Sequence, residues 1–425
     1  GVAGLELTRP WPGPALIRQV RVEGFDYGLR QEGMDCSMTY EHLTFVGQRR
    51  SAIWAMKQPF MSLRGIISEN AVPVLQVDGS NAIINVLDSR FTWTGAGEAP
   101  PAITCGAHLV LKGIAVEGYP VVVRAPADKK SKGGDLVTMP GGKGSLAFFT
   151  SRAPTRVVDG PTDRIPDLAV KETPQFHHSD FTRWAKPQDF ALGSRTAGIQ
   201  EAIDSGAEIV YLPNGTYRIE EPIILRGKLR KVMGMEAIIQ RTYGGDGRDG
   251  RKATVMRFVG VEGGMLHLEH LGARGVVEQD CDQTLVIRKC DTSCRNTIRG
   301  TGDIFLEDGM FGHSALRFPG RLWARQYNSE FGKEPQFTNR LGQAWILGMK
   351  VEGDTHAFLN QGGISECYAL YSMTGHAVKG VYVENVEGWL AISLREGGQG
   401  SHAIRFKDTW LGAGGQVGGP REQRL

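Results

Sequence analysis

The chain has 425 residues, of which 41% are hydrophobic, and its 49 basic and 46 acidic side chains leave a formal net charge of +3. So small a net charge, with both signs mixed along the chain, argues against a nucleic-acid partner or an anionic membrane surface. No apolar run approaches the roughly 20 residues of a membrane span. A chain of this length exceeds one ordinary hydrophobic core, so we expect two domains or a repeat architecture.

The N-terminal sequence GVAGLELTRPWPGP has neither the basic start nor the continuous apolar stretch of a secretion signal. It begins inside a strand-rich pattern, which predicts that the first domain is N-terminally incomplete.

The six cysteines are few for this length. Cys290 and Cys294 have a spacing that could bind a metal, but no histidine or second cysteine pair has a matching spacing. We favour buried free thiols, while a disulfide and a metal site stay open as alternatives. No metal and no other cofactor is expected.

Short apolar strands recur at an interval near 22 residues in two parts of the chain. Between residues 17 and 125, equivalent places are taken by Val22, Phe45 and Ile67, at intervals of 23 and 22. After residue 265, a second series has intervals of 19, 19, 22 and 23, and it consists of Val286, Phe305, Ala324, Ile346 and Ala369. Each strand is followed by the Gly, Asn or Asp residues typical of turns.

This period is typical of a parallel β-helix, in which each coil stacks on the previous one. Leucine-rich repeats have a similar period, but their signature is absent. A β-sandwich would need a hairpin turn every 8–12 residues, and the two-residue Asn-Gly turn is rare here. We therefore expect an all-β protein made of two tandem right-handed parallel β-helices.

The repeat is interrupted by a long stretch rich in Pro, Gly and charged residues. We accordingly expect a first β-helix at residues 1–125, a connector at 126–190 and a second β-helix at 191–425.

The second β-helix is predicted to begin with a short amphipathic helix. Its apolar stripe consists of Ile199, Ala202 and Ile203, and either Ser194 or Thr196 is expected to cap its N-terminus. Such a helix would cover the open end of the first coil.

A tryptophan and a glutamate each occur twice at the same interval. Trp323 and Trp345 are 22 residues apart (345 − 323), and so are Glu330 and Glu352 (352 − 330). In a β-helix, residues one coil apart lie about 4.8 Å from each other. Packing explains a tryptophan pair, but two carboxylates at that spacing oppose each other's ionisation. We therefore expect Glu330 to stay ionised and Glu352 to hold its proton.

Several motifs resemble known β-helix proteins. The sequence TAGIQEAID followed by IVYLPNGTYRI resembles the opening of pectate-lyase-like β-helices. Downstream, the second half resembles the second domain of the exo-β-1,3-glucanases of glycoside hydrolase family 55, through IFLEDG, RLWARQYNSE, NRLGQAWILGMKVEG and GGISECY. Those enzymes consist of two β-helices on one chain with the active site between them.

The resemblance implies an inverting hydrolase in which Glu352 is the general acid and Glu330 the second carboxylate. It also implies a water held by polar side chains of the first domain, for which Gln58 and Ser80, 22 residues apart (80 − 58), are candidates. Further candidates for substrate binding are Trp323, Arg325, Tyr327 and Lys350. The rings of Trp323, Tyr327, Phe337 and Trp345 could equally stack on sugars or belong to the core. We expect turn or solvent-exposed roles for Asp303, Glu307, Asp308 and Glu366.

Two other functions stay open on the same fold. A polysaccharide lyase would use Arg325 or Lys350 as its base, and often calcium, although no acidic cluster for calcium is evident. A carbohydrate-binding or tailspike-like module would need no catalytic group. The expected partner is in each case a polysaccharide, the expected state is monomeric, and the resemblance implies a secreted or periplasmic protein.

Overall fold

The computed structural model describes residues 1–9, 12–33, 37–57, 59–79, 82–127, 132–152, 166–177, 180–242, 252–330, 334–353, 355–373, 383–397, 405–411 and 417–424. Of residues 373, 394–397, 405–411 and 417–424 it describes the backbone alone. Within the described part of the chain, no helix has the length and apolar character needed to cross a bilayer.

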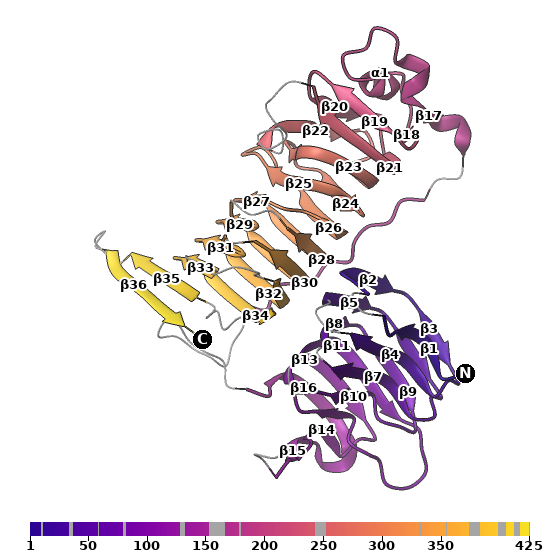
Figure 1. Cartoon of the computed structure of the whole chain (residues 1–425), viewed down its shortest axis with the longest axis vertical. Coiled ribbons are helices and arrows are strands. Elements are labelled where there is room, and N and C mark those ends of the chain that lie inside the picture. The colour runs from indigo at the N-terminus through magenta and orange to yellow at the C-terminus, as the bar shows by residue number, and fades with distance from the viewer. Residues whose placement is uncertain are drawn as a thin grey trace.

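The described chain folds into two stacks of parallel strands, which confirms the prediction of tandem parallel β-helices (Figure 1). The first β-helix contains β1 (Ala3–Leu7), β2 (Ala15–Arg18), β3 (Arg21–Glu23), β4 (Tyr27–Gly33), β5 (Ser37–Glu41), β6 (Thr44–Val46), β7 (Ser51–Lys57), β8 (Phe60–Arg64), β9 (Ile67–Asn70), β10 (Leu75–Asp78), β11 (Ile83–Trp93), β12 (Ile103–Cys105), β13 (His108–Glu117), β14 (Val121–Ala125), β15 (Gly134–Thr138) and β16 (Lys143–Thr150).

The second β-helix contains β17 (Trp184–Ala185), β18 (Ile209–Leu212), β19 (Thr216–Ile219), β20 (Ile223–Gly227), β21 (Lys231–Arg241), β22 (Thr254–Val261), β23 (Met265–Gln279), β24 (Thr284–Arg288), β25 (Asp291–Asn296), β26 (Asp303–Met310), β27 (Ser314–Arg317), β28 (Arg321–Ser329), β29 (Phe337–Arg340), β30 (Gln343–Glu352), β31 (Phe358–Gln361), β32 (Ile364–Met373), β33 (Val383–Val386), β34 (Trp389–Gly397), β35 (Arg405–Leu411) and β36 (Val417–Arg424). Short 3₁₀ turns occur at Pro140–Gly142, Phe181–Arg183 and Pro187–Phe190.

The first β-helix extends beyond residue 125, where the sequence predicts the connector to begin. Strand β15 pairs antiparallel with β14, and β16 pairs antiparallel with β13. These two strands end the parallel stack, and the composition of their sequence hid them because Gly, Pro and Lys are common in it.

The predicted helix is present as α1 (Ile199–Asp204), at the start of the second β-helix (Figure 1). Ile199, Ala202 and Ile203 are buried in the core of that β-helix, as the apolar stripe predicts. The N-cap position is taken by Gly198, which has no side chain to cap the helix, but the predicted Thr196 does accept a hydrogen bond at its Oγ1 from Gln200 N of the first turn, at 3.3 Å. Ser194 Oγ in turn accepts a hydrogen bond from Gly198 N at 2.8 Å, which fixes the turn before the helix.

The 22-residue interval is the register of adjacent strands: β28 and β30 pair Trp323 with Trp345, and Ala324 with Ile346. Some of the other equivalent positions expected from the repeat differ from the observed register by one or two residues, because the coils differ in length. Ser68, not Ile67, pairs with Phe45. Trp323, not Ala324, pairs with Phe305, and Cys367, not Ala369, pairs with Ile346.

Single residues with positive φ bend the coils where the two β-helices meet. In the second β-helix, Asp308, Gln326, Gly348 and Ala369 have φ values of 49°, 53°, 75° and 60°. Gly348 is held there for a second reason, because a Cβ atom on it would overlap Thr39 Oγ1 of the first β-helix. This position therefore sets how closely β30 and β5 approach.

Replacing Gly348 by alanine should lower the melting temperature more than the same change at Gly227. Both glycines have positive φ, but a Cβ atom on Gly227 would meet nothing within 4 Å. The backbone conformation alone costs about 1 kcal/mol at each site, and the overlap with Thr39 adds about 1–3 kcal/mol. Thermal unfolding of Gly348→Ala and Gly227→Ala checks this, and equal shifts would contradict it.

Candidate active site

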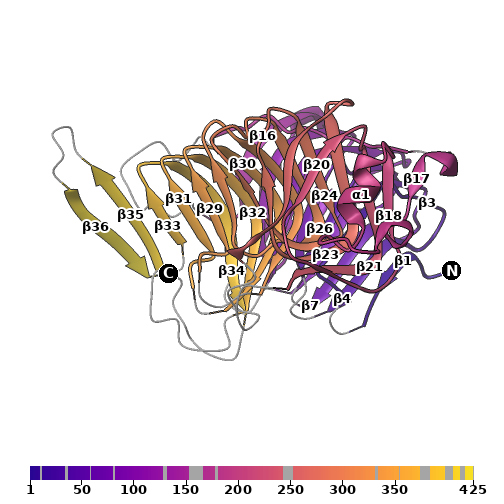
Figure 2. The same ribbon diagram turned by 90° about the horizontal axis from the view of Figure 1, so that it is seen from above.

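The two β-helices contact each other coil by coil, with their coils rising in the same direction (Figures 1 and 2). Thr39 Oγ1 lies between two coils of the second β-helix, 2.8 Å from Gln326 Oε1 on β28 and 3.3 Å from the carbonyl oxygen of Leu347 on β30. One coil further, Ser62 Oγ donates to the carbonyl oxygen of Tyr368 at 3.3 Å. In the next coil, Ser393 Oγ donates to Asn85 Oδ1 at 2.7 Å. Because both stacks have nearly the same rise per coil, these contacts stay in register.

Residues 166–177 form an extended segment that lies against this face of the second β-helix (Figure 1). Leu168 N donates to Glu366 Oε1 at 2.7 Å. Trp323 Nε1 donates to the carbonyl oxygen of Ala169 at 2.9 Å, and Lys231 Nζ donates to that of Phe176 at 3.1 Å. The segment therefore crosses the coils from β32 to β21, and a stretch that the sequence assigned to the connector is part of the interface.

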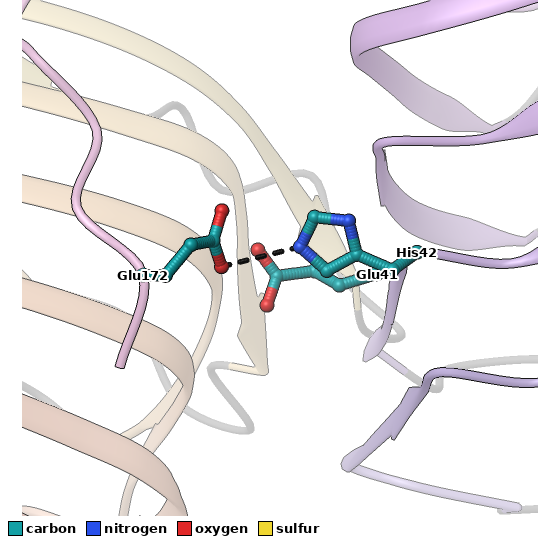
Figure 3. A group of neighbouring side chains, drawn as sticks. All are labelled: Glu41, His42 and Glu172. Atoms are coloured by element: carbon teal, nitrogen blue, oxygen red, sulfur yellow. Dashed lines mark hydrogen bonds and ion pairs between the residues drawn. The ribbon is translucent and has the colours of Figure 1, made fainter. Parts of the chain in front are cut away.

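A partly buried ion cluster joins the first β-helix, the segment 166–177 and the second β-helix. Glu41 is 1% exposed and binds Arg64 Nη1 at 2.9 Å and Arg325 Nε at 2.7 Å. Arg64 also binds Glu172 Oε1 at 2.6 Å, and His42 Nε2 lies 3.2 Å from Glu172 Oε2. Figure 3 shows Glu172 on the segment facing Glu41 and His42 of the first β-helix.

Glu41, His42 and Glu172 place potential metal-ligand atoms within 4.8 Å of one another (Figure 3). Both carboxylates already have guanidinium partners in Arg64 and Arg325. A divalent cation would have to lie beside these two fixed positive charges, so we interpret the cluster as an ion-pair network rather than a metal site.

Replacing Glu172 by glutamine should destabilise the protein at neutral pH but not in acid. Hydrogen bonds from His42 and Arg64 outweigh partial burial and hold the pKa of Glu172 far below its usual range. A depressed folded-state pKa stabilises the fold above the unfolded value of about 4.3, and this stabilisation is lost as the pH falls further.

The measurement is the difference in melting temperature between wild type and Glu172→Gln at pH 7, 5, 4 and 3. The difference should be constant down to about pH 5 and then shrink. Glu23→Gln is the matched control, since Glu23 is equally exposed and pairs with Arg21 on its own strand. A difference that stayed unchanged below pH 4 would rule out this role for Glu172.

All four aromatic residues that the sequence left as candidates for sugar stacking are buried. Tyr327 and Phe337 are 0% exposed and lie in the core of the second β-helix. Trp323 and Trp345 lie in a separate apolar cluster with Leu87 of the first β-helix, at 5% and 1% exposure. Of the two alternatives that the sequence leaves open, burial selects the core position over sugar stacking, because every ring lies in a coil or in the contact between the β-helices.

The predicted substrate ligand Arg325 is also buried, at 0% exposure, in the ion cluster with Glu41. Two of the four acidic residues expected in solvent are buried as well. Glu307 pairs with Arg18 and Arg288, and Glu366 accepts a hydrogen bond from Tyr368 Oη. Asp308 Oδ1 accepts from Leu16 N at 3.0 Å, and Asp303 pairs with Lys171 and Arg321. All four lie at the contact between the β-helices or against the segment 166–177.

The two predicted catalytic carboxylates do lie together, at the ends of β28 and β30. Lys350 Nζ donates to Glu330 Oε1 at 2.5 Å and also to Glu352 Oε1. The lysine is 8% exposed, while Glu330 and Glu352 are 35% and 37% exposed. Asn328 Nδ2 donates to Glu330 Oε1 at 3.2 Å. We call Asn328, Glu330, Lys350 and Glu352 the Lys350 cluster.

The electrostatics of the Lys350 cluster differ from those expected from two stacked carboxylates. The ammonium group of Lys350 lies between them and balances one of the two negative charges. Burial raises the pKa of Glu330, but hydrogen bonds from Lys350 and Asn328 outweigh it, so this pKa lies below its ordinary value. Glu330 is therefore ionised at neutral pH.

The Lys350 cluster lies next to the first β-helix. Lys350 is paired with Tyr371 on the neighbouring strand β32. The Tyr371 ring stacks on Phe60 of β8, with ring centroids 4.0 Å apart. Strand β8 of the first β-helix therefore lies one residue pair away from Lys350, at the edge of the contact between the two β-helices. Gln58 and Ser80, the predicted water ligands, lie outside the described residues.

Five cysteines, at positions 105, 281, 290, 294 and 367, are free thiols. All of them except the partly exposed Cys281 are buried, as the favoured interpretation expects, and Cys36 lies outside the described residues. The fold and the cluster define a tandem parallel β-helix protein with a carboxylate–lysine–carboxylate group beside the contact of its two β-helices. Comparison with protein-family models and with curated proteins found no match to this chain.

Proposed function

We propose that this protein is a glycoside hydrolase that cleaves β-1,3-glucan at the Lys350 cluster. The observation that supports the proposal is the half-exposed pair Glu330 and Glu352, held by one buried lysine beside the first β-helix. Glycoside hydrolysis needs a carboxyl group that protonates the leaving oxygen and a second group that supplies or activates a nucleophile. The choice of β-1,3-glucan rests on the motif resemblance of the second half.

In this proposal Glu352 protonates the glycosidic oxygen and Glu330 remains charged beside it. The two carboxylates share one ammonium group, so their nearest oxygens are roughly 5 Å apart or less. An inverting pair needs about 6.5–9.5 Å between its carboxyl groups. Glu330 is therefore too close to act as the base of an inverting mechanism. The attacking water would be held by the first β-helix, where Gln58 and Ser80 are the proposed ligands.

The charge of the cluster favours a hydrolase over a lyase. With Glu352 protonated as the general acid, the charges of Glu330 and Lys350 cancel, so the cluster has no excess positive charge to attract a uronate. A lyase that acts on uronate chains needs a positive groove and a base beside the substrate carboxylate. The buried lysine here is already committed to two carboxylates.

Wild-type protein should release sugar from laminarin, and Glu352→Gln should lose activity by at least about 100-fold, the range of a missing general acid. Reducing-sugar assays on laminarin, polygalacturonate and alginate, with and without a chelator, make the measurement. Glu220→Gln is the matched control, because Glu220 is 42% exposed and pairs with Arg195 far from the cluster.

Proton NMR of the first products gives the stereochemistry. An α-anomer indicates inversion with a water from the first β-helix, whereas a β-anomer would make Glu330 the nucleophile. Full activity in a folded Glu352→Gln protein would refute the assignment. Ultraviolet-absorbing unsaturated products would instead establish a lyase.

Glu330→Gln should reduce activity and move the basic limb of the pH–activity profile to lower pH. Without the negative charge of Glu330, the ammonium group of Lys350 interacts with Glu352 alone. This favours the ionised form of Glu352, so the general acid loses its proton at lower pH. Rates on laminarin from pH 3 to 9 test this, and a basic limb that moved to higher pH would contradict it.

A further inference from the structure

A buried glutamine joins the two strands that carry the Lys350 cluster. Gln336 is 1% exposed. Its Oε1 accepts a hydrogen bond from the hydroxyl group of Ser329, the last residue of β28. Its Nε2 donates to the main-chain carbonyl oxygen of Glu352, the last residue of β30, at 3.2 Å. Turning the amide over would place two carbonyl oxygens against each other at Glu352, so the direction of both hydrogen bonds is fixed.

The main chain of Gln336 is itself held by its neighbours. Its N–H group donates to the carbonyl oxygen of His356 at 2.8 Å, and its carbonyl oxygen accepts a hydrogen bond from Tyr327 Oη at 2.7 Å. Tyr327 lies in the core of the second β-helix, at 0% exposure. The side-chain amide is therefore anchored to the coil interior by backbone contacts, which a substitution at this position retains.

Two bridges thus join the ends of β28 and β30. One is Lys350, which donates to Oε1 of both Glu330 and Glu352. The other is Gln336, which connects the hydroxyl group of Ser329 to the main chain of Glu352. Ser329 directly precedes Glu330 in the chain. Because the two carboxylates repel each other, charge alone favours a wider separation of the strand ends. The amide of Gln336 opposes that separation.

We propose that Gln336 is a positioning residue, which fixes the general acid Glu352 relative to Glu330. The inference rests on the proposed function for the role of Glu352, and it identifies the contact that keeps this residue in place. Misplacing a catalytic group by about 1 Å can lower the rate about 100-fold. A buried neighbour that holds the main chain of the acid therefore acts on the proton transfer without touching the substrate.

Gln336→Met keeps the length of the side chain and removes both of its hydrogen bonds. On laminarin, kcat should fall by about 10- to 100-fold while KM changes little, because a buried side chain does not contact the substrate.

A second measurement on Gln336→Met requires no turnover. Without the amide, Glu352 moves away from Glu330 and leaves Lys350 to it, and both changes favour the ionised form of Glu330. The pKa of Glu330 already lies below its ordinary value. It should be lower still in the variant, as measured by carboxyl-carbon NMR titration of both proteins.

Gln336→Glu tests the same contacts with a side chain of the same shape. A protonated carboxyl group offers one donor and one acceptor, as the amide does, whereas the ionised form has no donor for the carbonyl oxygen of Glu352. Burial raises the pKa of a carboxyl group at this position. The variant should therefore approach the wild-type kcat in acid and lose activity as the pH rises, with its basic limb at lower pH than that of wild type.

Gln279→Met is the matched control. Gln279 is 0% exposed, and its Nε2 donates to the carbonyl oxygen of Gln283 after the end of β23. This variant should lower the melting temperature but leave kcat and the pKa of Glu330 unchanged. A folded Gln336→Met protein with the wild-type kcat, or with the wild-type pKa of Glu330, would overturn the inference.

Different results decide the two proposals. If wild type does not cleave laminarin but the pKa of Glu330 falls in Gln336→Met, the hydrolase proposal fails and the positioning of Glu352 stands. If wild type cleaves laminarin and Gln336→Met changes neither kcat nor that pKa, the reverse is true. If Gln336→Met does not fold, Gln336→Glu decides alone, and an unchanged pH–activity profile or an unchanged Glu330 titration would then overturn the inference.

Discussion

The contact between the two β-helices is in register over several coils, and the other features of the molecule depend on it. Each coil adds about 4.8 Å to either stack, so a contact made by one coil recurs in the next. Thr39 and Ser62, on adjacent coils of the first β-helix, approach the carbonyl oxygens of Leu347 and Tyr368, which lie on the adjacent strands β30 and β32 of the second. A shift by one coil would break all of these contacts together, which makes the pairing of the two β-helices specific.

Buried charge at this contact adds to its specificity. Arg325 is fully buried and binds Glu41 of the first β-helix as well as the carbonyl oxygen of Lys171 in the extended segment. Removing ions from water costs several kcal/mol for each ion and is offset only when every partner is in place. The network therefore stabilises one arrangement of the first β-helix, the segment 166–177 and the second β-helix, and any other arrangement would leave a buried charge unpaired. The cost also explains why the fully buried Glu41 has guanidinium partners in both Arg64 and Arg325.

The same arrangement separates the buried interface from the proposed site. Along β28 and β30, side chains point alternately into the coil and outward, toward the first β-helix. The carboxylates of the Lys350 cluster lie where these two strands end. Trp345 lies in the contact, while Lys350 lies near its edge. The carboxylates at the strand ends are thus held by rigid neighbours and remain partly exposed, as a site for a long polymer requires.

The sequence alone determined the repeat, the capping helix and the pairing of Glu330 with Glu352, because these follow from local periodicity and from strand register. Tertiary structure decided which outward faces are covered. Alternation along a strand distinguishes inside from outside, but it cannot show that a second β-helix buries Trp323, Trp345 and Arg325. Nor could composition show that residues 166–177 pack into the interface, since the partners of Glu172 come from strands more than 100 residues away in the chain.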